Sequence, residues 1–330
     1  MRGRRAVAGI AVMSVMSFAP SALAPAAGAT DRVQITGFFQ AYDSKRLITR
    51  SAAALTTVGV DGVSLSRDGA GVHEPDAAAV KAEYVAQHQG LRAEFLVSNW
   101  DHGFSTKLAR GLLGNPHNIS TVAAKLARVV DDQNWDGVSV DLESLHARDA
   151  AGLVSFLQTL RDDLAVGRSL SICISNSITS AEYADRGYDL GGIAATVDRI
   201  ILMAYDQHGP WEHKPGPVGG LGWQRKGLNV MSQEVPAAQI DLGQAGYGYA
   251  WRPSGTHSVS DARARYLVAK FHATAHWRSK PGEWTAHLPD GTTIWWADAR
   301  SLQVRLGVAR TRGLHGAAVW DLGQSDPITQ

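Results

Sequence analysis

Two carboxylates stand two positions apart at the end of the stretch WDGVSVDLE, residues 135–143. The apolar alternation predicts a buried strand, and side chains of a strand point alternately to its two faces. Ser139, Asp141 and Glu143 are therefore expected on one face, opposite the apolar side chains at 138, 140 and 142. Carboxyl groups this close raise each other's pKa and can divide the roles of acid and charge stabiliser. Cleavage of a glycosidic bond requires this division.

The same Asp-x-Glu pattern has a second interpretation, because a strand that ends in acids can simply run into a polar loop. The other strands of the fold decide between the catalytic and the polar-loop interpretation. If several other strands end in side chains suited to the same chemistry, and all the ends meet, the catalytic interpretation is favoured.

Short apolar runs alternate with amphipathic stretches such as 121–131 and 150–164, whose apolar positions have helical spacing. Eight such units in about 300 residues predict an α/β fold, a (β/α)8 TIM barrel rather than an open sheet. A chain of 330 residues that is 45% hydrophobic can fill its core. The predicted strands are residues 33–39, 54–60, 91–97, 137–142, 170–175, 199–204, 240–244 and 316–320.

The interval between the last two strands is too long for one connection. Residues 297–310 have the pattern of the expected helix, and two β-rich runs at 283–288 and 292–296 flank a Pro-Asp-Gly turn. We therefore expect a small α+β insertion at about 250–296, between the seventh strand and its helix.

In such barrels catalytic groups stand at the carboxyl ends of the strands. Besides the two acids of the fourth strand, polar and aromatic residues end four others. Aromatic rings that stack on sugar faces are the expected lining of a carbohydrate cleft, although a tryptophan taken alone is more often a core residue. The predicted rim residues are Asn99, Trp100, Met203, Tyr205, Asp206, Tyr247 and Trp320.

The first 29 residues have the composition of a secretion signal, with an arginine-rich start, an apolar run and the small residues Ala27-Gly28-Ala29 before the expected cleavage point. The twin-arginine route is a minor alternative. Removal leaves 29 basic and 31 acidic side chains, a net charge near −2. This balance gives no electrostatic case for nucleic acid or an anionic membrane. We expect a secreted or cell-wall-associated bacterial protein without a membrane span, and a monomer.

The twelve histidines and the single cysteine form no spacing typical of a metal centre, so no metal is predicted. Cys173 lies in the apolar run LSICI and has no cysteine partner within the chain. We expect it to pack as a small hydrophobic residue.

Three motifs resemble glycoside hydrolase family 18, the chitinase-like enzymes. The family pattern Asp-Gly-x-Asp-x-Asp-x-Glu corresponds to residues 136–143, Met-x-Tyr-Asp to residues 203–206, and the tryptophan of the last strand to Trp320. The runs HKPGPV at 213, GYGYAW at 246 and GAAVWDLG at 316 resemble the bacterial branch of cell-wall and spore-cortex N-acetylglucosaminidases. The motifs occur in the family order across almost the whole chain after the signal.

The resemblance implies retaining hydrolysis of β-1,4-linked N-acetylglucosamine glycans, such as peptidoglycan or chitin, with the substrate's own acetamido group as nucleophile. Glu143 would protonate the leaving oxygen, Asp141 would orient the acetamido group, and Tyr205 would donate a hydrogen bond to it. Trp320 would form the floor, and Asp206 would contact sugar hydroxyls or support Tyr205. No cofactor is implied.

One departure from the family is Ser139, which replaces the middle aspartate of the motif. Serine can hydrogen-bond to Asp141 but cannot share a negative charge, so weaker pKa coupling is expected. Two alternatives remain open: a chitinase-like lectin that binds without cleaving, and an endo-acting enzyme on N-glycan cores. Lectin-like relatives usually lose the glutamate that this chain keeps as Glu143.

Overall fold

The computed structural model describes residues 33–66 and 68–330, so the predicted signal at 1–29 lies outside the described residues. Within that part of the chain, eight parallel strands close a barrel in the order β1-β13-β7-β6-β5-β4-β3-β2. The predicted barrel class is confirmed. Its strands are β1 Gln34–Gln40, β2 Thr57–Ser64, β3 Arg92–Ser98, β4 Gly137–Asp141, β5 Ser169–Ser175, β6 Arg199–Met203, β7 Ile240–Ala245 and β13 Gly316–Trp320.

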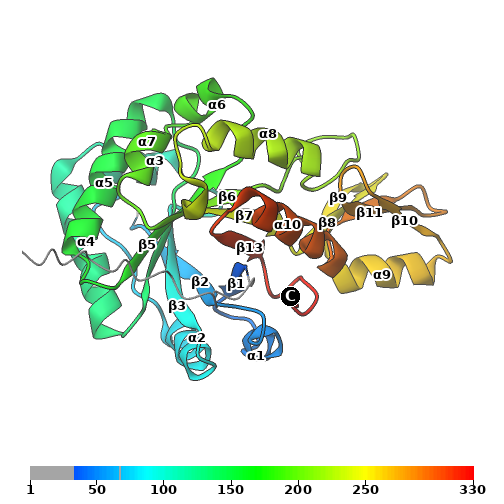
Figure 1. The fold of residues 1–330 in the computed structure, drawn as a ribbon, viewed down its shortest axis with the longest axis horizontal. Coiled ribbons are helices and arrows are strands. Elements are labelled where there is room, and N and C mark those ends of the chain that lie inside the picture. The colour runs from blue at the N-terminus through cyan, green and yellow to red at the C-terminus, as the bar shows by residue number, and fades with distance from the viewer. Residues whose placement is uncertain (1–32, 67) are drawn as a thin grey trace, which may run out of the picture. The chain divides into compact units, whose positions relative to one another are not determined.

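Helices lie around the outside of these strands (Figure 1). The predicted helical stretches 121–131, 150–164 and 297–310 correspond to α4, α5 and α10. The helices are α1 Arg46–Ser51, α2 Ala77–His88, α3 Thr106–Leu113, α4 Pro116–Asp132, α5 Ala150–Asp163, α6 Ser180–Asp185, α7 Leu190–Ala194, α8 Leu221–Met231, α9 Asp261–Lys270 and α10 Ala299–Arg312, with short 3₁₀ turns at Ala147–Asp149 and Ala237–Gln239. Among the described residues, none of the helices has the length and apolarity needed to cross a membrane.

A second, antiparallel sheet stands between β7 and α10, beside the barrel in Figure 1. In the described chain it has five strands in the order β10-β11-β12-β8-β9. The hairpin expected around Pro-Asp-Gly is present as β11 paired with β12. Its strands are β8 Tyr247–Arg252, β9 Gly255–Ser260, β10 Ala275–Arg278, β11 Glu283–His287 and β12 Thr293–Trp296.

The position of β8 corrects the sequence interpretation. Tyr247 was expected at the rim, just after a seventh barrel strand at 240–244. From Tyr247 the chain forms β8, which pairs with β12 of the second sheet, with Tyr249 opposite Trp295. The insertion therefore begins at 247 rather than at about 250. Alternating aromatic residues fit either kind of strand, so the pattern alone does not reveal where the chain changes sheets.

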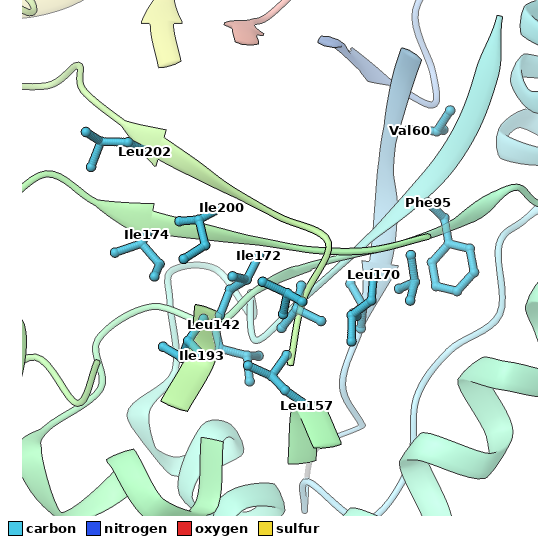
Figure 2. Packing of buried hydrophobic residues seen from close by; sticks show 14 of the residues in the cluster. Val60, Phe95, Leu142, Leu157, Leu170, Ile172, Ile174, Ile193, Ile200 and Leu202 are labelled. Atoms are coloured by element: carbon cyan, nitrogen blue, oxygen red, sulfur yellow. The ribbon is translucent and has the colours of Figure 1, made fainter. Parts of the chain in front are cut away.

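The main core lies between the barrel and its helices. In Figure 2, Ile172 and Ile200 of the strands lie with Leu157 of α5 and Ile193 of α7, and all four are almost completely buried. Burying each such side chain contributes about 1.5–3 kcal/mol. A smaller apolar cluster fills the barrel interior: Phe38, Leu96, Cys173, Ile201, Met203 and Ala318.

The Asp-Gly pair that opens β4 has a structural role. A Cβ on Gly137 would stand 2.2 Å from the carbonyl oxygen of Ser169, so only glycine lets β4 and β5 approach this closely. Asp136 accepts a hydrogen bond from the backbone N–H of Ala93 at 2.9 Å. These contacts fix the start of β4 and hence the register that places its far end.

Charged side chains are buried near the amino ends of the strands, away from the predicted rim. Arg199 of β6 donates to both carboxylate oxygens of Glu94 at 2.9 and 2.6 Å and lies 3.2 Å from Asp241. Burial alone raises the pKa of Glu94. The Arg199 charge and hydrogen bonds outweigh it and hold that pKa below its ordinary value.

Candidate active site

A cavity of about 630 Å³ opens at the carboxyl ends of the barrel strands. Seven of the ten predicted site residues line it: Trp100, Asp141, Glu143, Met203, Tyr205, Asp206 and Trp320. The other three, Asn99, Ser139 and Tyr247, lie behind its wall and contact residues that line it. The remaining lining residues are Gln40, Tyr42, Asp61, Gly62, Val63, Ser64, Leu96, Ser98, Phe104 and Cys173.

Strand β4 places the two acids as its alternation predicts. Val138, Val140 and Leu142 belong to the core outside the barrel. Asp141 is the last residue of the strand, and Glu143 follows two positions later at the cavity. The predicted common face is therefore the one that points into the barrel.

Glu143 is held in a setting that favours its protonated form. Burial raises its pKa to about 7, and the charge of Asp206 acts in the same direction. The hydroxyl of Ser175 donates to its Oε2 at 3.3 Å and opposes the shift, as does the charge of Arg186. A carboxyl with this pKa can donate a proton near neutral pH.

Asp141 is 5% exposed, and its Oδ1 has no hydrogen-bond partner among the described residues. Burial raises its pKa well above the ordinary value, and the charges of Glu143 and Asp61 add to the effect. An unpaired buried acceptor is costly. A ligand that donates a hydrogen bond inside the cavity would satisfy this oxygen.

Ser139 does not hydrogen-bond to Asp141, although a serine at this position is able to do so. Its hydroxyl lies 3.8 Å from the Sγ of Cys173, inside the barrel. Cys173 is buried in the interior apolar cluster, as expected, but it also lines the cavity floor. The residue that replaces the middle acid of the motif, Ser139, therefore contacts an uncharged thiol rather than Asp141.

Asp206 stands at the cavity mouth with a left-handed backbone, φ 60°. Its Oδ1 accepts from the hydroxyls of Tyr247 at 2.5 Å and Tyr249 at 2.8 Å. Burial raises the pKa of Asp206, and the two tyrosines oppose this. Tyr247 thus contacts Asp206 rather than lining the cavity, and strand β8 of the insertion fixes a residue of the barrel rim.

Asn99 was predicted to contact substrate, but it is fully buried. Its Oδ1 accepts from the backbone N–H of Glu143 at 3.0 Å, and its Nδ2 donates to the backbone carbonyl of Glu143 at 2.9 Å. Ser144, the next residue, has a left-handed φ of 58°. Asn99 therefore holds the backbone that carries Glu143.

Aromatic rings form the floor and walls. Trp320 packs on Phe38 with ring centroids 5.4 Å apart, while Trp100 is 53% exposed and contacts Phe104 edge to face at 5.1 Å. Tyr205 packs against the interior cluster, and burial raises the pKa of its hydroxyl so that the proton is retained.

The ten remaining lining residues were not predicted as site residues from the sequence, among them Gln40, Tyr42 and Asp61. Asp61 was missed because the second strand was expected to end at 60, whereas β2 continues through a register shift between Asp61 and Val63. Tyr42 lies two residues after the end of β1 and is 82% exposed. The rule that functional residues gather at the carboxyl ends of barrel strands would have identified Tyr42 and Asp61.

The described residues contain no group of three or more His, Cys, Asp or Glu placed to hold a metal ion. The lining carboxyls Asp61, Asp141, Glu143 and Asp206, together with the aromatic rings, are suited to proton transfer beside a sugar.

The family model described as "Glycosyl hydrolases family 18" matches residues 79–325, about three quarters of the chain. This chain belongs to glycosyl hydrolase family 18. It is a glycoside hydrolase by family, and the resemblance seen in the three motifs is confirmed.

Among curated proteins, this family 18 chain is 28% identical over 260 residues to a Bacillus subtilis protein named as a sporulation-specific glycosylase, YdhD, covering 75% of this chain and 60% of that protein. It is 27% identical over 300 residues to the Bacillus subtilis cortical fragment-lytic enzyme, covering 83% of this chain and 66% of that enzyme. The chain thus spans less than two thirds of each relative's length. These relatives confirm the resemblance to the spore-cortex branch.

Solved structures show the same fold. A chitinase of Chromobacterium violaceum superposes with a TM-score of 0.81 at 27% identity, covering 89% of this family 18 chain and 95% of that one. The spore cortex-lytic enzyme SleL of Bacillus cereus superposes with a TM-score of 0.80 at 20% identity, covering 89% and 72%. At 20% identity the second likeness concerns the fold alone.

Proposed function

We propose that this chain is a secreted, retaining glycoside hydrolase that cleaves β-1,4-linked glycans containing N-acetylglucosamine, peptidoglycan or chitin-like, by substrate-assisted catalysis. The observation that carries the proposal is the pair at the end of β4. Glu143 has its pKa raised to about 7, and Asp141 beside it keeps a buried oxygen without a partner in the described chain. One group can give a proton, and the other can accept one hydrogen bond.

In the first step Glu143 protonates the glycosidic oxygen as its bond to the anomeric carbon breaks. The carbonyl oxygen of the substrate's 2-acetamido group attacks the same carbon and closes a positively charged oxazolinium ring. Asp141 accepts the acetamido N–H through its free oxygen and stabilises the developing charge. Tyr205 retains its phenolic proton and donates it as a hydrogen bond to the attacking oxygen.

In the second step a water molecule attacks the anomeric carbon and reopens the ring. Glu143, now ionised, takes a proton from that water and returns to its starting state. Both displacements occur on the same carbon, so the configuration is retained. Trp320 lies beneath the reacting sugar, and Trp100 and Tyr42 supply faces for neighbouring units.

The substrate class rests on the site chemistry and on the relatives. The mechanism needs an N-acetyl group on the sugar whose bond breaks. The relatives' names speak of a chitinase and of spore-cortex lysis. The cavity-lining residues within the described chain include four carboxyls and no Lys, Arg or His, so a polyanion such as nucleic acid is disfavoured.

The test measures reducing ends released from N-acetylglucosamine oligomers, purified peptidoglycan and N-glycan cores by the wild type and Glu143→Gln. We expect hydrolysis by the wild type and a loss of at least about 100-fold in the variant. Equal rates for both proteins on every substrate would overturn the proposal. Calorimetric binding by the wild type without turnover would instead support the lectin alternative. Release of reducing ends from N-glycan cores alone would support the endo-acting alternative.

Export and oligomeric state are part of the proposal. The arginine-rich start and small-residue site of residues 1–29 support a cleaved signal. When the full-length chain is expressed, we expect the protein in the culture medium to begin near residue 30, as measured by amino-terminal sequencing. Light scattering should give the mass of a monomer. Retention of an intact leader in the cytoplasm would contradict secretion.

A further inference from the structure

A second, much smaller cavity lies where the barrel, the insertion and the C-terminal segment meet. Its volume is about 10 Å³, room for a single atom or water molecule. Barrel strands β7 and β13, helices α9 and α10 and the segment after β13 all contribute to it. Its walls are Gln244, Gly246, Asp261, Asp298, Ala299, Leu302, Val319, Ser325, Asp326, Pro327 and Ile328.

Three oxygens of these walls are buried and have no hydrogen-bond partner among the described residues: Oδ1 of Asp261, Oε1 of Gln244 and Oγ of Ser325. The three residues are 1%, 3% and 9% exposed. The other polar atoms of the first two side chains are used, since Asp261 Oδ2 accepts from the N–H of Asp326 and Gln244 Nε2 donates to the Asp298 carbonyl. The unpaired set is made of oxygens from three separate segments of the chain.

The charge around the cavity is negative. Asp298 and Asp326 line the cavity together with Asp261. The guanidinium of Arg265 is bonded to both oxygens of Asp326. A carboxylate here therefore lacks a close cation of its own within the described residues.

We propose that this cavity binds one hard metal cation of the calcium or sodium class, coordinated by Asp261, Gln244 and Ser325. Carboxylate, amide and hydroxyl oxygens are the ligands that such ions take, whereas transition metals favour imidazole and thiolate. Only one of the three proposed ligands, Asp261, is a carboxylate. The site therefore differs from metal centres built from several acids or histidines. The size of the cavity excludes organic ligands.

The ion would act structurally, because the proposed catalysis needs no metal. It would join β7, the first turn of α9 and the C-terminal segment at one point. Gly246, which lines the cavity, donates its N–H to the carbonyl of Trp320 at 2.7 Å. The site thus lies directly behind the strand end that carries the floor of the catalytic cavity.

The test uses the full chain treated with a chelator and then dialysed into buffer free of calcium and sodium. Thermal unfolding and calorimetry are followed during separate titrations with Ca²⁺, Na⁺ and Mg²⁺. At 100-fold excess over the dissociation constant, binding should raise the midpoint by about 4 °C for a chain of this size. We expect Ca²⁺ or Na⁺ to produce a saturable rise and Mg²⁺ little, because Mg²⁺ dehydrates reluctantly.

Asp261→Asn and Ser325→Ala are the test variants. The first keeps an acceptor for the Asp326 N–H, and the second removes a ligand without altering charge. Asp163→Asn, at the exposed end of α5, is the matched control and should respond as the wild type does. Loss of the rise in both test variants would support the site. No rise in the wild type, which is the outcome for a bound water, or an equal rise in all four proteins, would overturn it.

Discussion

The side chain of Asn99 and the backbone of Glu143 form two hydrogen bonds with each other, at 3.0 and 2.9 Å. A side-chain amide paired in this way with a single residue's N–H and C=O fixes the plane and position of that residue. Asn99, the residue directly after strand β3, thereby controls where the carboxyl that follows β4 is presented.

Asn99→Ala should reduce kcat by about 10- to 100-fold, because the acid is no longer held in its reactive position. KM should change little, since Asn99 does not line the cavity. The variant also loses three hydrogen bonds, two to Glu143 and one to the Ser105 carbonyl, which should cost about 2–3 kcal/mol of unfolding free energy. Steady-state kinetics and urea unfolding measure both effects. Asn118→Ala removes an amide-to-backbone bond from α4 to the Gly111 carbonyl of α3 and should leave kcat unchanged. An equal fall in kcat in that variant would contradict the positioning role.

The pH profile should report Glu143. This group must carry a proton to act as an acid, so kcat/KM should decline as pH rises through about 7. Ser175 stabilises the ionised form, and Ser175→Ala should move this decline to higher pH. Ser155→Ala, on the exposed face of α5, serves as the control. A decline that stays at the same pH in Ser175→Ala would show that another group controls it.

The same carboxyl should make the fold less stable as pH rises. Its pKa is about 7 in the folded chain against an ordinary 4.5, so the folded state binds more protons between these values. Stability therefore falls from pH 4.5 to 7. Glu143→Gln removes this dependence and should be more stable than the wild type by about 2 kcal/mol at pH 8 but not at pH 4, allowing for partial exposure. Chemical unfolding at both pH values measures the difference, with Glu74→Gln at an exposed site as control.

The buried charges at the opposite end of the barrel should matter for stability alone. Arg199→Met leaves Glu94 and Asp241 without their shared cation and should cost about 3–5 kcal/mol. Arg161→Met breaks a more exposed pair with Asp198 and should cost at most about 1 kcal/mol. Urea midpoints compare the two. Equal costs would show that burial is not the deciding factor.

The sequence predicted those parts of the site that depend on strand periodicity and on strand ends. Alternation placed Asp141 and Glu143 on one face, and Tyr205, Asp206 and Trp320 followed from the ends of other apolar runs. Roles that depend on a side chain's hydrogen-bond partners could not be predicted from the sequence. Asn99 and Tyr247 have the composition of ligand-contacting residues, yet they bond to Glu143 and Asp206. The order of residues in one strand does not reveal which atom of a neighbouring element lies within 3 Å.

The hydrogen bonds from Tyr247 and Tyr249 to Asp206 make the insertion part of the catalytic barrel. Deleting residues 247–296 would leave Asp206 in its left-handed conformation without either donor. The outer strands β9 and β10 make no such bonds to Asp206. Substitutions in those outer strands, for example to bind longer glycans, should therefore leave Asp206 in place. Substitutions of Tyr247 or Tyr249 in β8 should not.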